Sequence, residues 1–139
     1  MKNSLFVLFV LMTSVVFSQE VPFESPKIAI KIPLGVSITL DNHAIKFIEV
    51  LEDSRCPKNT TCVWEGRARV LVEVSEKGKE SYQKTLIFGK TLEGESKDKV
   101  LFSFKDSKVV GMMLNPYPNS EEAIKGDTYV LLIYQTKDD

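Results

Sequence analysis

Two cysteines carry the most definite chemistry in this sequence. Cys56 and Cys62 are the only cysteines among the 139 residues, and five residues separate them. A pair this close can form a disulfide in an oxidising compartment or offer two thiolates to a metal ion. The C-x5-C spacing is not a usual zinc pattern, and His43 is the only histidine that could serve as a further ligand. We therefore predict a Cys56–Cys62 disulfide and expect no metal or cofactor.

Charged and aromatic residues flank the two cysteines. Asp53 and Arg55 precede the first cysteine, and Trp64 and Glu65 follow the second. Tryptophan and arginine are frequent anchors of protein interfaces, and binding residues concentrate on loops. One interpretation is therefore a binding surface made of Asp53, Arg55, Trp64 and Glu65. The other is structural: the guanidinium of Arg55 pairs with Asp53 or with loop carbonyls, and Trp64 packs toward the disulfide or the core.

The sequence offers little basis for catalysis. A Ser–His–acid nucleophile needs a base, and the only candidate is His43, which we expect to face solvent beside an Asp41-Asn42 turn. Adjacent acidic residues such as Glu121-Glu122 are typical of solvated loops. The sequence has no EF-hand pattern and no glycine-rich phosphate loop. We predict that the protein is not an enzyme.

The first 18 residues predict export. Lys2 is the only charge ahead of an apolar stretch from Leu5 to Phe17, which is typical of a secretory signal peptide. Val16 and Ser18 are suitable residues at positions −3 and −1, so we place the cleavage after Ser18. The alternative is an uncleaved membrane anchor, but the stretch is shorter than the roughly 20 residues that span a bilayer. We expect a periplasmic or extracellular protein whose residues 19–139 form one domain.

The charge balance argues against some partners. The chain has 18 Lys and Arg and 19 Asp and Glu residues, and cleavage after Ser18 removes only Lys2, which leaves a net charge of −2. This balance gives no electrostatic basis for binding nucleic acid or an anionic membrane surface. No second apolar stretch is long enough to cross a membrane, so we expect neither nucleic-acid binding nor a membrane span after residue 18.

Alternation of apolar and polar residues predicts strands along most of the remaining chain. A change of the apolar parity at Phe47 indicates a β-bulge. The last apolar segment is hydrophobic on both faces, which is typical of a central strand. The fold class is therefore all-β, an antiparallel sandwich or barrel of about eight strands. We expect the strands at 28–32, 36–40, 44–51, 62–75, 82–88, 100–104, 109–114 and 129–134.

The segment around the cysteines resembles a group of small exported bacterial proteins of uncharacterised function. The shared pattern is a strand, then D-S-R-C-P, a short loop, C-x-W-x-G and a second strand, here residues 53–57 and 62–66. The later stretches VVGMMLNPYPNS and DTYVLLIYQ are also similar to the closing part of the group. This resemblance covers most of the chain after residue 18. It implies export and a single β domain, and it implies no particular activity.

Together these features predict an exported β-sandwich that is a non-catalytic binding or structural module of the cell envelope, with a protein or other envelope partner. The alternative is a secreted enzyme inhibitor, or a small hydrolase, that acts through the Cys56–Cys62 end of the domain. The position of Trp64 distinguishes the interpretations. An exposed ring favours a binding role, because a purely structural role requires a buried one.

Overall fold

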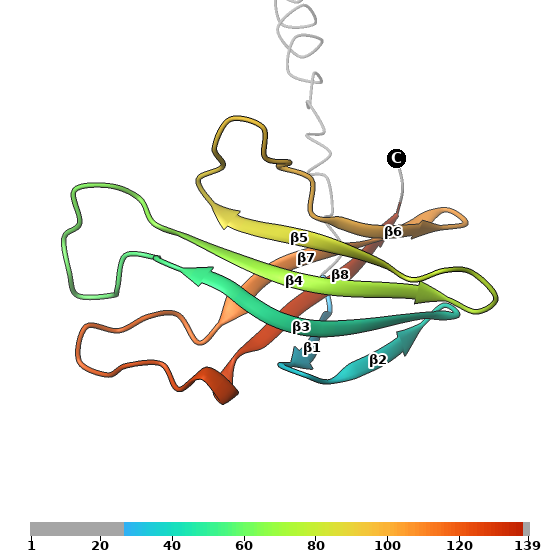
Figure 1. Ribbon diagram of the computed structural model, residues 1–139, viewed down its shortest axis with the longest axis horizontal. Helices are drawn as coiled ribbons and strands as arrows, with labels where there is room; N and C mark the ends of the chain where they lie inside the picture. The colour runs from blue at the N-terminus through green and yellow to red at the C-terminus, as the bar shows by residue number, and fades with distance from the viewer. Residues whose placement is uncertain (1–26, 138–139) are drawn as a thin grey trace, which may run out of the picture.

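The computed structural model describes residues 27–137, and these form two antiparallel four-stranded sheets packed as a sandwich (Figure 1). One sheet has the strand order β1-β8-β7-β6 and the other has the order β2-β3-β4-β5. This confirms the predicted all-β antiparallel fold of about eight strands, and of the two forms expected, sandwich or barrel, it is the sandwich. The elements are β1 (Ala29–Pro33), β2 (Ser37–Leu40), β3 (His43–Asp53), β4 (Arg67–Glu76), β5 (Tyr82–Gly89), β6 (Val100–Phe104), β7 (Ser107–Asn115), a 3₁₀ turn (Gly126–Thr128) and β8 (Val130–Lys137).

The signal peptide predicted for residues 1–18 lies outside the described residues. Within residues 27–137, no helix has the length and apolar character needed to cross a membrane.

The core lies between the sheets because each strand turns one side of its alternating pattern inward. In β4 every second residue from Ala68 to Val74 is fully buried. Large buried side chains come from β3, beside it in the same sheet, and from β8 in the facing sheet. Each fully buried Val, Leu, Ile or Phe side chain contributes about 1.5–3 kcal/mol relative to an exposed one. The fully buried side chains include Ile32, Ile45, Phe47, Val70, Val72, Val74, Leu86, Leu131 and Ile133.

Local expectations about the strands are also confirmed. The pairing of β3 with β4 shifts register between Phe47 and Glu49, where the change of parity predicted a bulge. Asp41 and Asn42 form the β2–β3 turn, with φ values of 49° and 64° that suit Asp and Asn. The β8 strand lies between β1 and β7, as expected for a segment that is apolar on both faces.

The expectation that His43 faces solvent is wrong. The tight turn pairs Leu40 with His43 and directs the imidazole inward, where only 6% of the residue is exposed. Its ring stacks on Phe102 at 3.9 Å between centroids, and Nδ1 lies 2.9 Å from the Asp41 carbonyl oxygen. Nε2 lies 3.4 Å from a carboxylate oxygen of Glu76. The histidine is therefore part of the packing between the two sheets.

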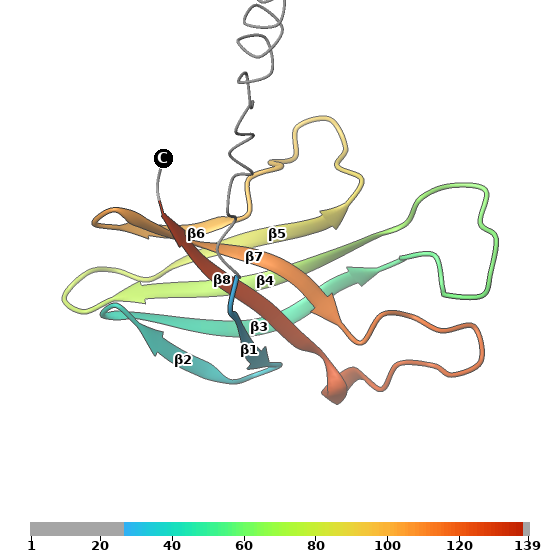
Figure 2. The same ribbon diagram turned by 180° about the vertical axis from the view of Figure 1, so that it is seen from behind.

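The expected strand over 62–75 is correct only from Arg67 onward. Residues 54–66, here called the disulfide loop, connect β3 to β4 outside the sheet. Figure 2 shows this loop and the β7–β8 connection extending from the same end of the sandwich. The alternating pattern continues through residues 62–66, but their backbone makes no strand pairing. Trp64 is largely exposed, so the prediction that it packs toward the core is wrong.

Candidate functional site

The disulfide loop contains the residues singled out in the sequence. The predicted bond between Cys56 and Cys62 is present, with a Cα–Cα distance of 6.0 Å. The backbone N–H of Lys58 donates to the Pro118 carbonyl at 2.9 Å, which ties the loop to the β7–β8 connection. The loop is therefore closed on itself by a covalent bond and held at one side by a neighbouring segment of chain.

A buried guanidinium fixes the base of the disulfide loop. Arg55 donates from Nε to Oδ1 of Asp53 at 2.7 Å and from Nη2 to Oδ2 at 2.6 Å, which is the bidentate geometry of a strong ion pair. The two side chains are only 8% and 7% exposed. The same guanidinium donates to the carbonyls of Leu114 at 2.6 Å and Pro116 at 2.9 Å. Arg55 thereby connects the end of β3 to the end of β7, in the other sheet.

A tyrosine from the β7–β8 connection, one residue before β8 begins, completes this cluster. The hydroxyl of Tyr129 donates to Oδ2 of Asp53 at 2.9 Å. Burial raises the pKa of Asp53, but hydrogen bonds from Arg55 and Tyr129 oppose that effect and hold the pKa below its usual range. Burial, followed by the hydrogen bond to Asp53, raises the pKa of Tyr129 to about 12. At neutral pH the cluster therefore contains one carboxylate, one guanidinium and one neutral phenol.

Gly66 allows the second arm of the loop to pass close to the first. A Cβ atom at this position would lie 1.6 Å from the Ser54 carbonyl oxygen, so no other residue fits without a backbone shift. The N–H of Ser54 donates to the Arg67 carbonyl at 2.8 Å at the same crossing. The glycine of the C-x-W-x-G pattern thus makes room for the neighbouring strand end.

Ion pairs stabilise the start of β4, next to the point where Gly66 passes Ser54. Arg67 pairs with Glu52 at 3.0 Å and with Glu95 at 2.6 Å. Hydrogen bonds from Arg67 and Ser54 hold the pKa of Glu52 below its usual range. The loop therefore leaves the sandwich from two strand ends that are both held by charged contacts.

Residues 63 and 64, here called the apex of the disulfide loop, present an apolar surface to solvent. Val63 is 94% exposed and Trp64 is 74% exposed, and Glu65 beside them is also exposed. The four residues predicted as a binding surface are thus divided into two pairs. Asp53 and Arg55 are buried and position the loop, while Trp64 and Glu65 lie on its surface.

Several residues of this site were not singled out from the sequence. Tyr129 and the carbonyls of Leu114 and Pro116 lie 59 to 76 positions from their partners, and no local pattern connects them. Val63 adjoins the predicted Trp64, but its place in an apparently regular alternation suggested a strand residue. Among residues 27–137, no group of three or more His, Cys, Asp and Glu side chains is arranged to hold a metal ion.

Comparison with known proteins adds no further assignment. No protein-family model, curated protein or solved structure matches the chain. The geometry of the disulfide loop and its surroundings is therefore the basis for assigning a function.

Proposed function

We propose that this protein is an exported, non-catalytic binding module that recognises a partner protein through the apex of its disulfide loop. The observation that carries the proposal is the exposure of Trp64 beside Val63. Tryptophan is enriched among the residues that dominate binding energy at protein interfaces. Two adjacent exposed apolar side chains, Val63 and Trp64, offer apolar surface that another molecule can cover.

The structure around the loop supports a binding role. The disulfide, the Arg55 cluster and the Gly66 crossing restrict the conformations of the loop before any partner arrives. A recognition loop that is already ordered loses less conformational entropy on binding, which increases affinity. Glu65, next to the tryptophan, offers a charge at the rim of the apolar apex, where it can influence orientation and association rate.

Export is the other part of the proposal. The predicted signal peptide and the disulfide support a periplasmic or extracellular location, because disulfides persist in oxidising compartments. The resemblance to small exported bacterial proteins supports the same location. We place the partner in the cell envelope or the surrounding medium.

The partner can equally be an enzyme that the loop inhibits, because an exposed loop held in one conformation suits both partner binding and enzyme inhibition. A hydrolase acting at the loop is less well supported. His43 begins β3, whereas the disulfide loop follows the other end of that strand, and the imidazole is buried against Phe102. It therefore has no access to a substrate bound at the loop.

Photo-crosslinking tests the proposal. A benzoylphenylalanine replacing Val63 is expected to capture a protein of the cell envelope, whereas the same group replacing Lys79 at the far hairpin is expected not to. Adding Trp64→Ala to the Val63 probe should abolish the specific product while the domain stays folded. Equal capture from both positions, or capture that survives Trp64→Ala, would contradict the proposal.

A further inference from the structure

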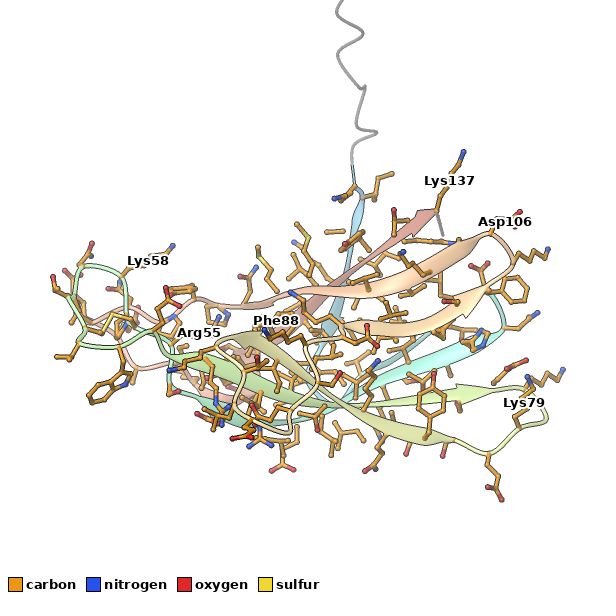
Figure 3. The ribbon with its side chains drawn as sticks, turned by 90° about the horizontal axis from the view of Figure 1, so that it is seen from above. Arg55, Lys58, Lys79, Phe88, Asp106 and Lys137 are labelled. Carbon is orange, nitrogen blue, oxygen red and sulfur yellow. A yellow bond between two sulfur atoms is a disulfide. The ribbon has the colours of Figure 1, made fainter. Side chains whose placement is uncertain are left out.

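A second feature at this end of the sandwich is a groove separate from the exposed apex of the loop. Its volume is about 520 Å³, which lies within the roughly 300–1,000 Å³ typical of small-molecule sites. It lies where the end of β5, the end of β7 and the disulfide loop meet. Figure 3 shows Lys58, Arg55 and Phe88, which line it, away from the hairpin that carries Lys79.

The walls of the groove are largely apolar. Phe88 of β5 contributes to one wall, and the exposed side chains of Met112 and Met113 of β7 contribute to another. Tyr117, from the β7–β8 connection, is also exposed along the groove. Methionine side chains are flexible and polarisable, so they adapt to apolar ligands of varied shape.

The charges of the groove are all positive. Its lining residues include Arg55, Lys58 and Lys99 and no acidic residue. Arg55 is neutralised by Asp53, but neither lysine forms an ion pair with another residue in the range 27–137. Instead, each ammonium lies over an aromatic ring that also lines the groove: Lys58 Nζ is 5.8 Å from the centre of Tyr117, and Lys99 Nζ is 5.8 Å from that of Phe88.

We propose that this groove binds a small amphiphilic carboxylate, an anion with an apolar chain of the fatty-acid type. The chain would lie against the phenylalanine and the two methionines, where it removes apolar surface from water. The carboxylate would pair with Lys58 or Lys99, whose charges no acidic side chain of residues 27–137 neutralises. This proposal does not depend on the proposed protein partner.

The backbone around the groove favours a small ligand over an extended peptide. A peptide that adds to a sheet edge needs free carbonyl and N–H groups on the strand beside it. Here the Leu114 carbonyl accepts from Arg55, and the Gly111 N–H donates to the Lys99 carbonyl at 2.9 Å. These two groups are therefore not available to an added strand, and the side chains named above remain to recognise a ligand.

Methionine labelling provides a local measurement. The chain has four methionines, of which only Met112 and Met113 lie after residue 18. With ¹³C-methyl methionine in the full chain, Met112→Leu and Met113→Leu assign the two groove signals. Titration with decanoate below its micelle concentration is expected to shift both signals to saturation. Decyl maltoside, which has the same chain and no charge, is expected to bind about tenfold more weakly.

Charge variants test the assignment of the carboxylate. Lys58→Gln and Lys99→Gln should together weaken decanoate binding by about tenfold, while Lys79→Gln on the distant hairpin should leave it unchanged. Trp64→Ala should also leave it unchanged, so failure of the protein-binding proposal would not affect this one. Binding of a fatty-acid-type anion is overturned if decanoate gives no saturable shift at Met112 and Met113, or if decyl maltoside binds equally well. It is also overturned if Lys58→Gln combined with Lys99→Gln has no effect on decanoate binding. An extended acidic peptide that shifts these signals when decanoate does not would overturn it as well.

Discussion

Replacing Arg55 by glutamine should destabilise the domain strongly, because it leaves a buried charge without its partner. The change removes two hydrogen bonds to Asp53, at 2.7 and 2.6 Å, and two to carbonyls of β7 and the residue beyond it. The Asp53 carboxylate, only 7% exposed, keeps the Tyr129 hydroxyl and a weak backbone contact. Breaking a buried ion pair from one side costs about 3–5 kcal/mol. That is a large part of the roughly 5–15 kcal/mol that stabilises a typical domain.

Urea unfolding followed by far-ultraviolet circular dichroism at neutral pH measures this loss. Arg69→Gln is the matched control, because Arg69 is 33% exposed and its nearest carboxylate oxygens lie at 3.7 and 3.8 Å. We expect that control to lose less than about 1 kcal/mol. The double variant Asp53→Asn with Arg55→Gln should lose less than Arg55→Gln alone, because it leaves no orphaned charge. If Arg55→Gln and Arg69→Gln lose the same small amount of unfolding free energy, the buried pair contributes no more to stability than an exposed one.

Three further predictions concern the base of the loop. Gly66→Ala should lower the free energy of unfolding by about 1–3 kcal/mol, because the added Cβ meets the Ser54 carbonyl. In the same urea assay the control Gly126→Ala, whose Cβ would enter open space, should change it by less than about 0.5 kcal/mol. Replacing both Cys56 and Cys62 by serine should cost about 2 kcal/mol, measured by urea unfolding against the oxidised wild type, because the closed loop is short. Because the pKa of Asp53 in the folded state lies below its ordinary value of 3.8, the ionised carboxylate contributes stability above pH 3.8. That stability is lost as the pH falls through the folded-state pKa, so the urea midpoint of the wild type should drop in that range. The midpoint of Asp53→Asn should drop less.

Each of these has a clear contrary result. Equal stabilities for the two glycine variants would show that the close crossing at Ser54 is not required. A serine variant as stable as the wild type would show that the disulfide does not constrain the unfolded chain. An Asp53→Asn variant with the same acid profile as the wild type would assign acid sensitivity to other carboxylates, such as Glu52.

The strands could be predicted because their information is local. Alternation in the first half of β3 and in β4 follows from one buried and one more exposed face, and the parity change at Phe47 marks a bulge in the sequence itself. The disulfide is equally local, since one close cysteine pair in a chain predicted to be exported has little alternative. These features need no knowledge of how the two sheets pack.

The interior contacts of the site depend on that packing. Nothing near Arg55 indicates that its guanidinium reaches carbonyls 59 and 61 residues later, so its burial was not foreseen. His43 looked like a turn residue because its burial depends on Phe102 in the other sheet. Trp64 was misplaced because residues 62–66 alternate like a strand, whereas the disulfide and the crossing at Gly66 keep them outside the sheet.

We propose that Trp64 serves recognition and not folding. The most direct test is specific photo-crosslinking from position 63 in Trp64→Ala, scored beside its urea unfolding curve. With 74% of the tryptophan exposed, we predict a change in unfolding free energy of less than about 0.5 kcal/mol and loss of the crosslinked partner. A loss of about 3–5 kcal/mol of unfolding free energy, as on truncation of a core aromatic, would show that Trp64 serves folding. A variant that keeps the crosslinked partner would show that Trp64 is not needed for recognition.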